Sequence, residues 1–229
     1  KTYLDSLLSK TIIEPHWKDR FETILDSYLG TCPAVFKYNN VEYNAMTFAA
    51  SLGINTDDYA GFTSYNHHPF YKPFDLEIPD NYSHGQYTNL PLDQLIELVD
   101  ASINQGYTVE WDGDVSEPGF LRKYGVAVLM KPGTVLGDSI PTEEIPNQET
   151  RQYAFDSHQT TDDHLMHITG IATDQKGNRY YITKNSWGKN SGIGGYVYIS
   201  ANYLKLQTVS IYINKAAITP VIKHFLEMP

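Results

Sequence analysis

The feature that most constrains this chain is a pair of predicted strands in its last third, one beginning at a histidine and the next ending beside an asparagine. Residues 164–173 and 179–184 are rich in β-branched and aromatic side chains, and Lys176-Gly177-Asn178 is typical of a hairpin turn. The start of the first strand and the end of the second lie side by side in an antiparallel hairpin. We therefore expect His164 and Asn185 to lie within hydrogen-bond reach of each other.

A histidine held by a neutral amide has the chemistry of a catalytic base. The side-chain oxygen of Asn185 can accept the imidazole N–H of His164, which fixes the tautomer and the ring plane, while the other ring nitrogen faces a nucleophile. Trp187 follows two residues after Asn185 and is placed to cover that hydrogen bond. His167 is three strand positions from His164, so the two side chains point to opposite faces and form no metal-binding pair.

These residues resemble the C-terminal signature of the papain-like cysteine peptidases. The signature consists of Asp163-His164 with Gly170 six residues later, Asn185-Ser186-Trp187-Gly188, and Gly195-Tyr196. A longer similarity, to the bleomycin hydrolase or aminopeptidase C branch, covers residues 26–30, 67–71, 89–93 and 107–115.

The resemblance implies a cysteine-type aminopeptidase that hydrolyses peptide bonds with a Cys-His-Asn triad. It assigns His164 and Asn185 to catalysis and Asp163 and Trp187 to substrate binding, with no cofactor and no metal. It also implies peptide substrates, a homo-oligomer and a cytoplasmic location, although export stays open. The chain corresponds to the C-terminal half to two-thirds of such an enzyme and begins without Met. We therefore expect a processed chain or a fragment whose partner is the missing N-terminal half.

The nucleophile of the family is not found in this sequence. Its motif, a Gln upstream of Gly-x-Cys-Trp, is absent, and the one cysteine is Cys32. The separation of Cys32 from His164 and Asn185 suits a papain-like pattern. We nevertheless reject it, because no Gln precedes it, no Trp follows it, and the next segment is predicted as a strand rather than the helix N-terminus that lowers a thiol pKa. We expect Cys32 to be a small buried hydrophobic residue.

The whole chain is predicted to have an α+β, papain-like fold in which a β-rich C-terminal half carries added N-terminal helices. Residues 1–90 are expected to be helical and loop-rich, with helices over 3–29 (interrupted at Pro15) and 45–52, two short strands around Asn39-Asn40, and a long ordered loop over 60–90. Residues 91–229 are expected to be the β-rich half that carries the His/Asn site. They are predicted to contain a helix over 92–105, a strand over 107–111, a mostly irregular stretch over 112–160, and late strands over 196–199 and 209–213.

Metal binding is not favoured by the other candidate residues. His67 and His68 are adjacent in a predicted loop, and the sequence suggests no carboxylate partner for them. Asp112 and Asp114 flank a glycine as in a calcium loop, but no Glu follows at the required position. A single cysteine also excludes an intramolecular disulfide and a Cys-based zinc site.

Three functions remain open from the sequence. The first is the aminopeptidase, with its nucleophile on another segment. The second is a catalytically inactive papain-like binding or scaffold module, against which the presence of both His164 and Asn185 argues. The third is an unrelated β-rich interaction domain, which the paired motifs disfavour. The 229 residues carry a net charge of −10, which disfavours nucleic acid and anionic membranes as partners. No apolar run approaches the ~18 residues of a transmembrane helix.

Overall fold

A computed structural model of the chain describes residues 2–10, 15–134 and 140–227. The chain forms two compact units, Lys1–Asn55 and Thr56–Pro229. The boundary predicted at residue 90 lies inside the second unit. None of the helices in the described part of the chain is long and apolar enough to cross a lipid bilayer.

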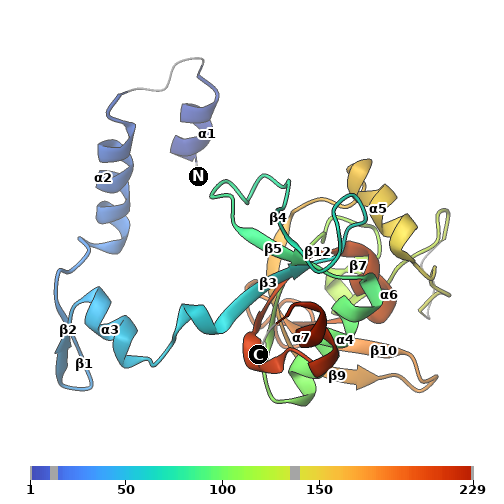
Figure 1. Cartoon of the computed structure of the whole chain (residues 1–229). Coiled ribbons are helices and arrows are strands. Elements are labelled where there is room, and N and C mark those ends of the chain that lie inside the picture. The colour runs from blue at the N-terminus through green and yellow to red at the C-terminus, as the bar shows by residue number, and fades with distance from the viewer. Residues whose placement is uncertain (1, 11–14, 135–139, 228–229) are drawn as a thin grey trace. The chain divides into compact units, whose positions relative to one another are not determined.

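The first unit combines short helices with a two-stranded hairpin (Figure 1). Its elements are α1 (Thr2–Leu8), α2 (Trp17–Leu29), β1 (Phe36–Tyr38), β2 (Val41–Tyr43) and α3 (Ala45–Ser51). Asn39 and Asn40 form the hairpin turn with φ values of 50° and 65°, the left-handed region that a two-residue turn of type I′ requires. These elements confirm the predictions for this region, except that residues 11–14 lie outside the described residues.

The second unit is built on a ten-stranded sheet in the order β4-β5-β3-β12-β6-β9-β10-β11-β8-β7. The strands are β3 (Tyr59–Thr63), β4 (Pro73–Asp75), β5 (Gln86–Asn89), β6 (Val109–Gly113), β7 (Phe120–Leu121), β8 (Val126–Ala127), β9 (His164–Thr173), β10 (Arg179–Lys184), β11 (Tyr196–Ser200) and β12 (Thr208–Asn214). Neighbours pair antiparallel except for β3 with β5 and β8 with β11, which are parallel. The last strand in the chain, β12, lies between β3 and β6.

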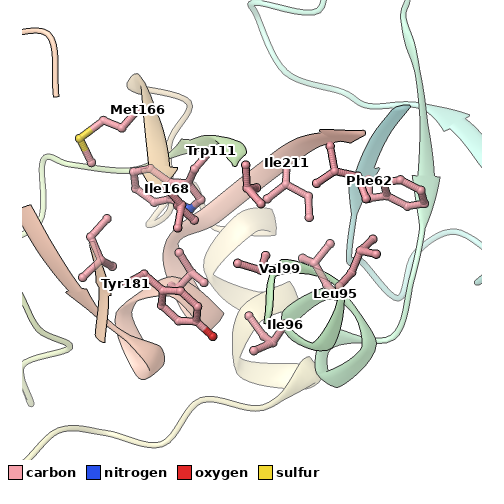
Figure 2. Packing of buried hydrophobic residues seen from close by; sticks show 14 of the residues in the cluster. Phe62, Leu95, Ile96, Val99, Trp111, Met166, Ile168, Tyr181 and Ile211 are labelled. Atoms are coloured by element: carbon pink, nitrogen blue, oxygen red, sulfur yellow. The ribbon is translucent and has the colours of Figure 1, made fainter. Parts of the chain in front are cut away.

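Helix α4 (Leu92–Asn104) provides the main hydrophobic partner of the sheet. Its apolar stripe, which includes Leu95 and Val99, belongs to one buried cluster with Trp111, Ile168 and Ile211 from three adjacent strands, as Figure 2 shows. Successive residues of a strand point to opposite faces of a sheet. The alternate residues of β6, β9 and β12 therefore face away from this core.

The remaining helices are α5 (Gln148–Asp156), α6 (Ala201–Gln207) and α7 (Pro220–Phe225), with single 3₁₀ turns at Thr56–Asp58, Arg122–Tyr124 and Lys215–Ala217. Helix α5 is anchored by Arg151, which is 1% exposed. The guanidinium donates to the carbonyl oxygens of Ser64 at 2.8 Å and of Lys205 and Leu206 at 3.1 Å each. It also lies 4.6 Å from the ring centre of Tyr65. Arg151 thus ties α5 to the carboxyl end of α6.

Two predictions for the second unit were wrong. The expected loop over 60–90 contains β3, β4 and β5, whose lengths of 5, 3 and 4 residues are too short to give a clear alternating pattern. The expected irregular stretch over 112–160 contains α5, whose buried residues Arg151, Gln152 and Ala154 are mostly polar. A helix that buries polar side chains lacks the apolar period on which the prediction relied. The predicted helix over 92–105 and the late strands are confirmed.

Candidate active site

The β9–β10 hairpin brings His164 and Asn185 together as the sequence predicts. Its antiparallel register pairs Lys184 with His167, so the start of β9 lies next to the end of β10. Asn185 directly follows β10, and its Oδ1 is 2.9 Å from Nε2 of His164. This distance confirms the predicted proximity of the two side chains.

The orientation of the Asn185 amide determines which ring nitrogen of His164 carries the proton. The backbone N–H of Ser186 donates to Oδ1 of Asn185 at 2.7 Å, so this oxygen faces both the backbone and the ring. Asn185 is 7% exposed, and its backbone N–H donates to the carbonyl oxygen of Gly195 at 2.9 Å. Because Oδ1 only accepts, Nε2 of His164 must donate, and Nδ1 of the neutral ring keeps a lone pair.

Trp187 stacks on the imidazole ring of His164, with ring centres 4.8 Å apart and planes 21° from parallel. The guanidinium of Arg122 lies 4.5 Å from the Trp187 ring centre, and the Phe120 and Trp187 rings meet edge to face with centres 6.0 Å apart. Arg122 in turn donates to Oγ of Ser191 at 3.1 Å. Sequence reasoning missed Arg122, because no local pattern connects the 3₁₀ turn after β7 with the segment after β10.

Asp163, which precedes His164, is held by Thr161 and by the segment that follows β6. Its Oδ1 accepts from the hydroxyl of Thr161 at 2.8 Å, and its Oδ2 accepts from the backbone N–H of Val115 at 3.4 Å. Burial raises the pKa of Asp163, but the hydrogen bonds, chiefly from Thr161, outweigh this effect and hold it below the usual range. Asp163 is therefore ionised at neutral pH. Its role in substrate binding stays a prediction.

Cys32 lies in the segment between α2 and β1, and no helix begins there. This agrees with the reasons for rejecting it as the nucleophile. The expectation of a buried residue was wrong, because Cys32 is exposed. The stretch that follows it forms the small hairpin of the first unit and provides no core that covers the thiol.

His67 and His68 have a carboxylate partner that the sequence did not suggest. Glu77 accepts from Nε2 of His67 at 3.2 Å and lies 2.8 Å from Nε2 of His68. Among the described residues, this is the group whose donor atoms all lie close enough to hold a metal ion, within 4.8 Å of one another.

Hydrogen bonds explain the arrangement of this group without an ion. The Gln152 amide accepts from Asn66 N–H through its oxygen at 2.6 Å and offers its nitrogen to Nδ1 of His67 at 2.9 Å. Nε2 of His67 therefore carries a proton and is already used in a bond to Glu77. Burial raises the pKa of Glu77, but hydrogen bonds from His68 and His67 outweigh this and lower it.

Comparison with known proteins identifies relatives of this chain. Aminopeptidase G of Lactobacillus delbrueckii subsp. lactis is 25% identical over 178 residues, which cover 75% of this chain and 39% of that protein. Aminopeptidase C of Lactobacillus helveticus is 27% identical over 173 residues, which cover 69% and 37%. The chain thus spans about two-fifths of the length of these curated relatives.

The fold has a solved counterpart in PepW from Lactobacillus rhamnosis HN001. The two superpose with a TM-score of 0.68 at 20% identity, over 91% of this chain and 49% of that one. The likeness shows an α+β fold of the papain-like peptidase type. A family profile, the Peptidase C1-like family, matches residues 37–229. The chain therefore belongs to the peptidase C1-like family, the papain-like cysteine peptidases.

Proposed function

We propose that this chain carries the catalytic histidine and its orienting asparagine in a cysteine aminopeptidase, and that the nucleophilic cysteine is provided by a polypeptide segment outside these 229 residues. The observation that carries the proposal is the 2.9 Å contact of His164 Nε2 with an Asn185 oxygen whose orientation is fixed by Ser186 N–H. The names of the relatives, aminopeptidases C and G, support the release of N-terminal residues from peptides.

In this mechanism Nδ1 of His164 exchanges the proton. The cysteine thiolate adds to the peptide carbonyl carbon, and the imidazolium gives its Nδ1 proton to the amine nitrogen as the C–N bond breaks. Water then attacks the thioester while Nδ1 accepts its proton, and the C–S bond breaks to release the acid. Asn185 keeps Nε2–H in place throughout, so that Nδ1 is the nitrogen that faces the reaction.

Two further residues have proposed roles beside this pair. Trp187 covers the ring of His164 and limits access of water to the bond with Asn185, and its exposed surface borders the peptide. Asp163, ionised beside the histidine, is proposed to contact substrate. In the enzyme assembled with its N-terminal half, Asp163→Asn separates this role from a structural one, because a lost substrate contact raises KM while kcat is kept.

The chain alone is expected to be inactive, because the members of a catalytic unit are strongly non-additive and loss of the nucleophile removes nearly all of its effect. The test is hydrolysis of aminoacyl-coumarin substrates by the chain alone and with the N-terminal half added. Restored activity that His164→Ala abolishes and Cys32→Ala leaves unchanged is the expected result. Turnover by the chain alone that depends on Cys32 would refute the proposal. A complex of the two halves without turnover would favour a binding or scaffold module.

A further inference from the structure

A pocket of about 610 Å³ lies on the face of the sheet opposite to the hydrophobic core. Its floor is formed by the alternate residues of the three adjacent strands β12, β6 and β9, including Asp112, Glu110 and His167. Their neighbours in sequence, such as Trp111 and Met166, face the core. His164 is two positions before Met166 on β9, so the two side chains lie on the same face of the strand. That face is opposite to the one that lines this pocket.

Asp112 is a buried carboxylate in this floor. It is 5% exposed. One oxygen, Oδ2, accepts from the hydroxyl of Ser210 at a long 3.4 Å, while Oδ1 has no hydrogen-bond partner among the described residues. A buried carboxylate is costly unless it is paired or protonated. The floor of the pocket thus contains a carboxyl group that the hydrogen bonds of the described residues satisfy poorly, and its neighbour Asp162 is also an acid.

The other ionisable groups of the pocket add negative charge. Glu110 precedes Asp112 by two residues on the same face, and Asp80 lines the rim. Asp162 lies next to Asp112. His167, which bonds Thr108 at 2.6 Å, is the one basic side chain among the lining residues, which include no Lys or Arg.

The two carboxyl groups of the floor hold their protons more tightly than carboxyls in water do. Burial raises the pKa of Glu110 to about 7. Burial, together with the neighbouring charge of Asp162, raises the pKa of Asp112 to about 8. A cation bound close to both carboxyl groups would lower both pKa values, because an opposite charge favours the ionised form.

The walls of the pocket are aromatic. Tyr212 lies opposite Glu110 in the β12–β6 register, and the ring of Tyr87 meets it edge to face with centres 6.4 Å apart. Gly61 pairs with Tyr212 across β3, and a Cβ atom at this position would come within 2.8 Å of both rings. The absence of a side chain at Gly61 therefore makes room for the two tyrosines. Tyrosine faces attract cations, most strongly where water is excluded.

We propose that this pocket binds an organic cation, an alkylammonium or a guanidinium group, with Asp112 and Glu110 as counterions and Tyr87 and Tyr212 as walls. A metal ion fits less well, because the described donor atoms that converge closely enough for one are those of His67, His68 and Glu77. Carboxylates spread over the floor instead suit a larger cation that presents several N–H donors and an apolar stem.

The test is calorimetric titration of the 229-residue chain with n-butylammonium and n-butylguanidinium chloride, and with n-butanol as the neutral analogue. We expect saturable binding of at least one cation and none of butanol. Asp112→Asn and Glu110→Gln each weaken it about tenfold, since each removes one charge close to the cation. Asn has the shape of the protonated carboxyl, so Asp112→Asn keeps the fold. Glu97→Gln, which removes an exposed charge from α4, leaves binding unchanged.

Binding should also strengthen as the pH rises from about 6 to about 9, because the cation displaces the protons of Asp112 and Glu110. The groups that face these carboxyls are Asp162, Ser210, Tyr87, Tyr212 and His167. Tripeptides Gly-Lys-Gly and Gly-Arg-Gly distinguish the source of the cation: tighter binding than the free cation indicates a polypeptide side chain, and weaker binding a free amine. Failure of both cations to bind, binding that Asp112→Asn leaves unchanged, or preference for calcium chloride would overturn the proposal.

Discussion

Replacement of Asn185 by alanine should allow the neutral His164 ring to populate both of its tautomers. The bond from Nε2–H to Oδ1 is 2.9 Å long, lies beside the stacked Trp187 ring, and joins two neutral groups. Such a bond contributes about 0.5–1.5 kcal/mol, and shielding by Trp187 favours the upper part of that range. Since 1.4 kcal/mol corresponds to a factor of ten, the bond biases the ring about tenfold toward the Nε2–H form.

Nitrogen-15 NMR of the histidine-labelled chain measures this bias without any enzymatic activity. At about pH 9, where histidines are neutral, the His164 ring of the unaltered chain should show a protonated Nε2 and a bare Nδ1. In Asn185→Ala the two nitrogens should shift toward averaged values, because both tautomers become populated. In an assembled, active enzyme the same change should lower kcat about tenfold or more, since the wrong nitrogen then faces the nucleophile part of the time.

Asn178→Ala is the matched control, because Asn178 lies at the opposite end of the same hairpin, where its side chain bonds Asp174 at 2.8 Å. It should leave the His164 signals unchanged. A ring that remains fully in the Nε2–H form in Asn185→Ala would refute the reasoning, as would an unaltered chain whose His164 carries its proton on Nδ1.

Three further outcomes follow from polar side chains of the second unit. Arg151→Met should lower the free energy of unfolding, measured in urea titrations, by about 2–4 kcal/mol, because three carbonyl oxygens lose a charged donor. Removal of the buried charge offsets part of this loss. A loss below about 1 kcal/mol would contradict the prediction. Asp112 has a pKa of about 8 in the folded chain, far above its unfolded value, so the native state binds the extra proton and stability should fall as the pH rises from about 4 to about 8. Asp112→Asn should flatten that slope, whereas a slope that stays the same would assign it to other groups. Asn147→Ala removes the capping box of α5, in which Oδ1 accepts from Thr150 N–H at 2.8 Å, and should lower the melting temperature by an amount equivalent to about 1 kcal/mol; Asn190→Ala, outside any helix, serves as its control.

The predictable parts of the fold are those set by neighbouring residues. The β9–β10 hairpin and the His164–Asn185 contact follow from one turn and two strands adjacent in sequence. Helix α4 follows from an apolar stripe that ends at a glycine. The same local reasoning placed the β1–β2 turn at Asn39 and Asn40, whose positive φ values tolerate few other residues.

The parts that could not be predicted depend on distant segments. Strand β3 is a strand because it pairs with β12 and β5, and five residues carry too little pattern to indicate this alone. Helix α5 is stabilised by the bonds of Arg151 to the carbonyl oxygens of Ser64, Lys205 and Leu206. These residues are more than 50 positions away in sequence, so a local pattern around α5 cannot reveal the bonds. The aromatic and acidic pocket has the same origin, since Asp112, Tyr212 and Tyr87 meet only through sheet pairing.

The central position of β12 has a consequence for the order in which the chain can fold. Thr63 donates to the carbonyl oxygen of Val209, a residue 146 positions later, and β12 is the only strand of the described sheet that joins β3 to β6. During synthesis, β3 and β6 therefore have unpaired edges until residue 214 has left the ribosome. Contacts of such long sequence separation form slowly, and unpaired edges associate with other chains. The second unit should fold only after its synthesis is nearly finished, and truncation before Thr208 should produce an aggregating chain rather than a smaller stable domain.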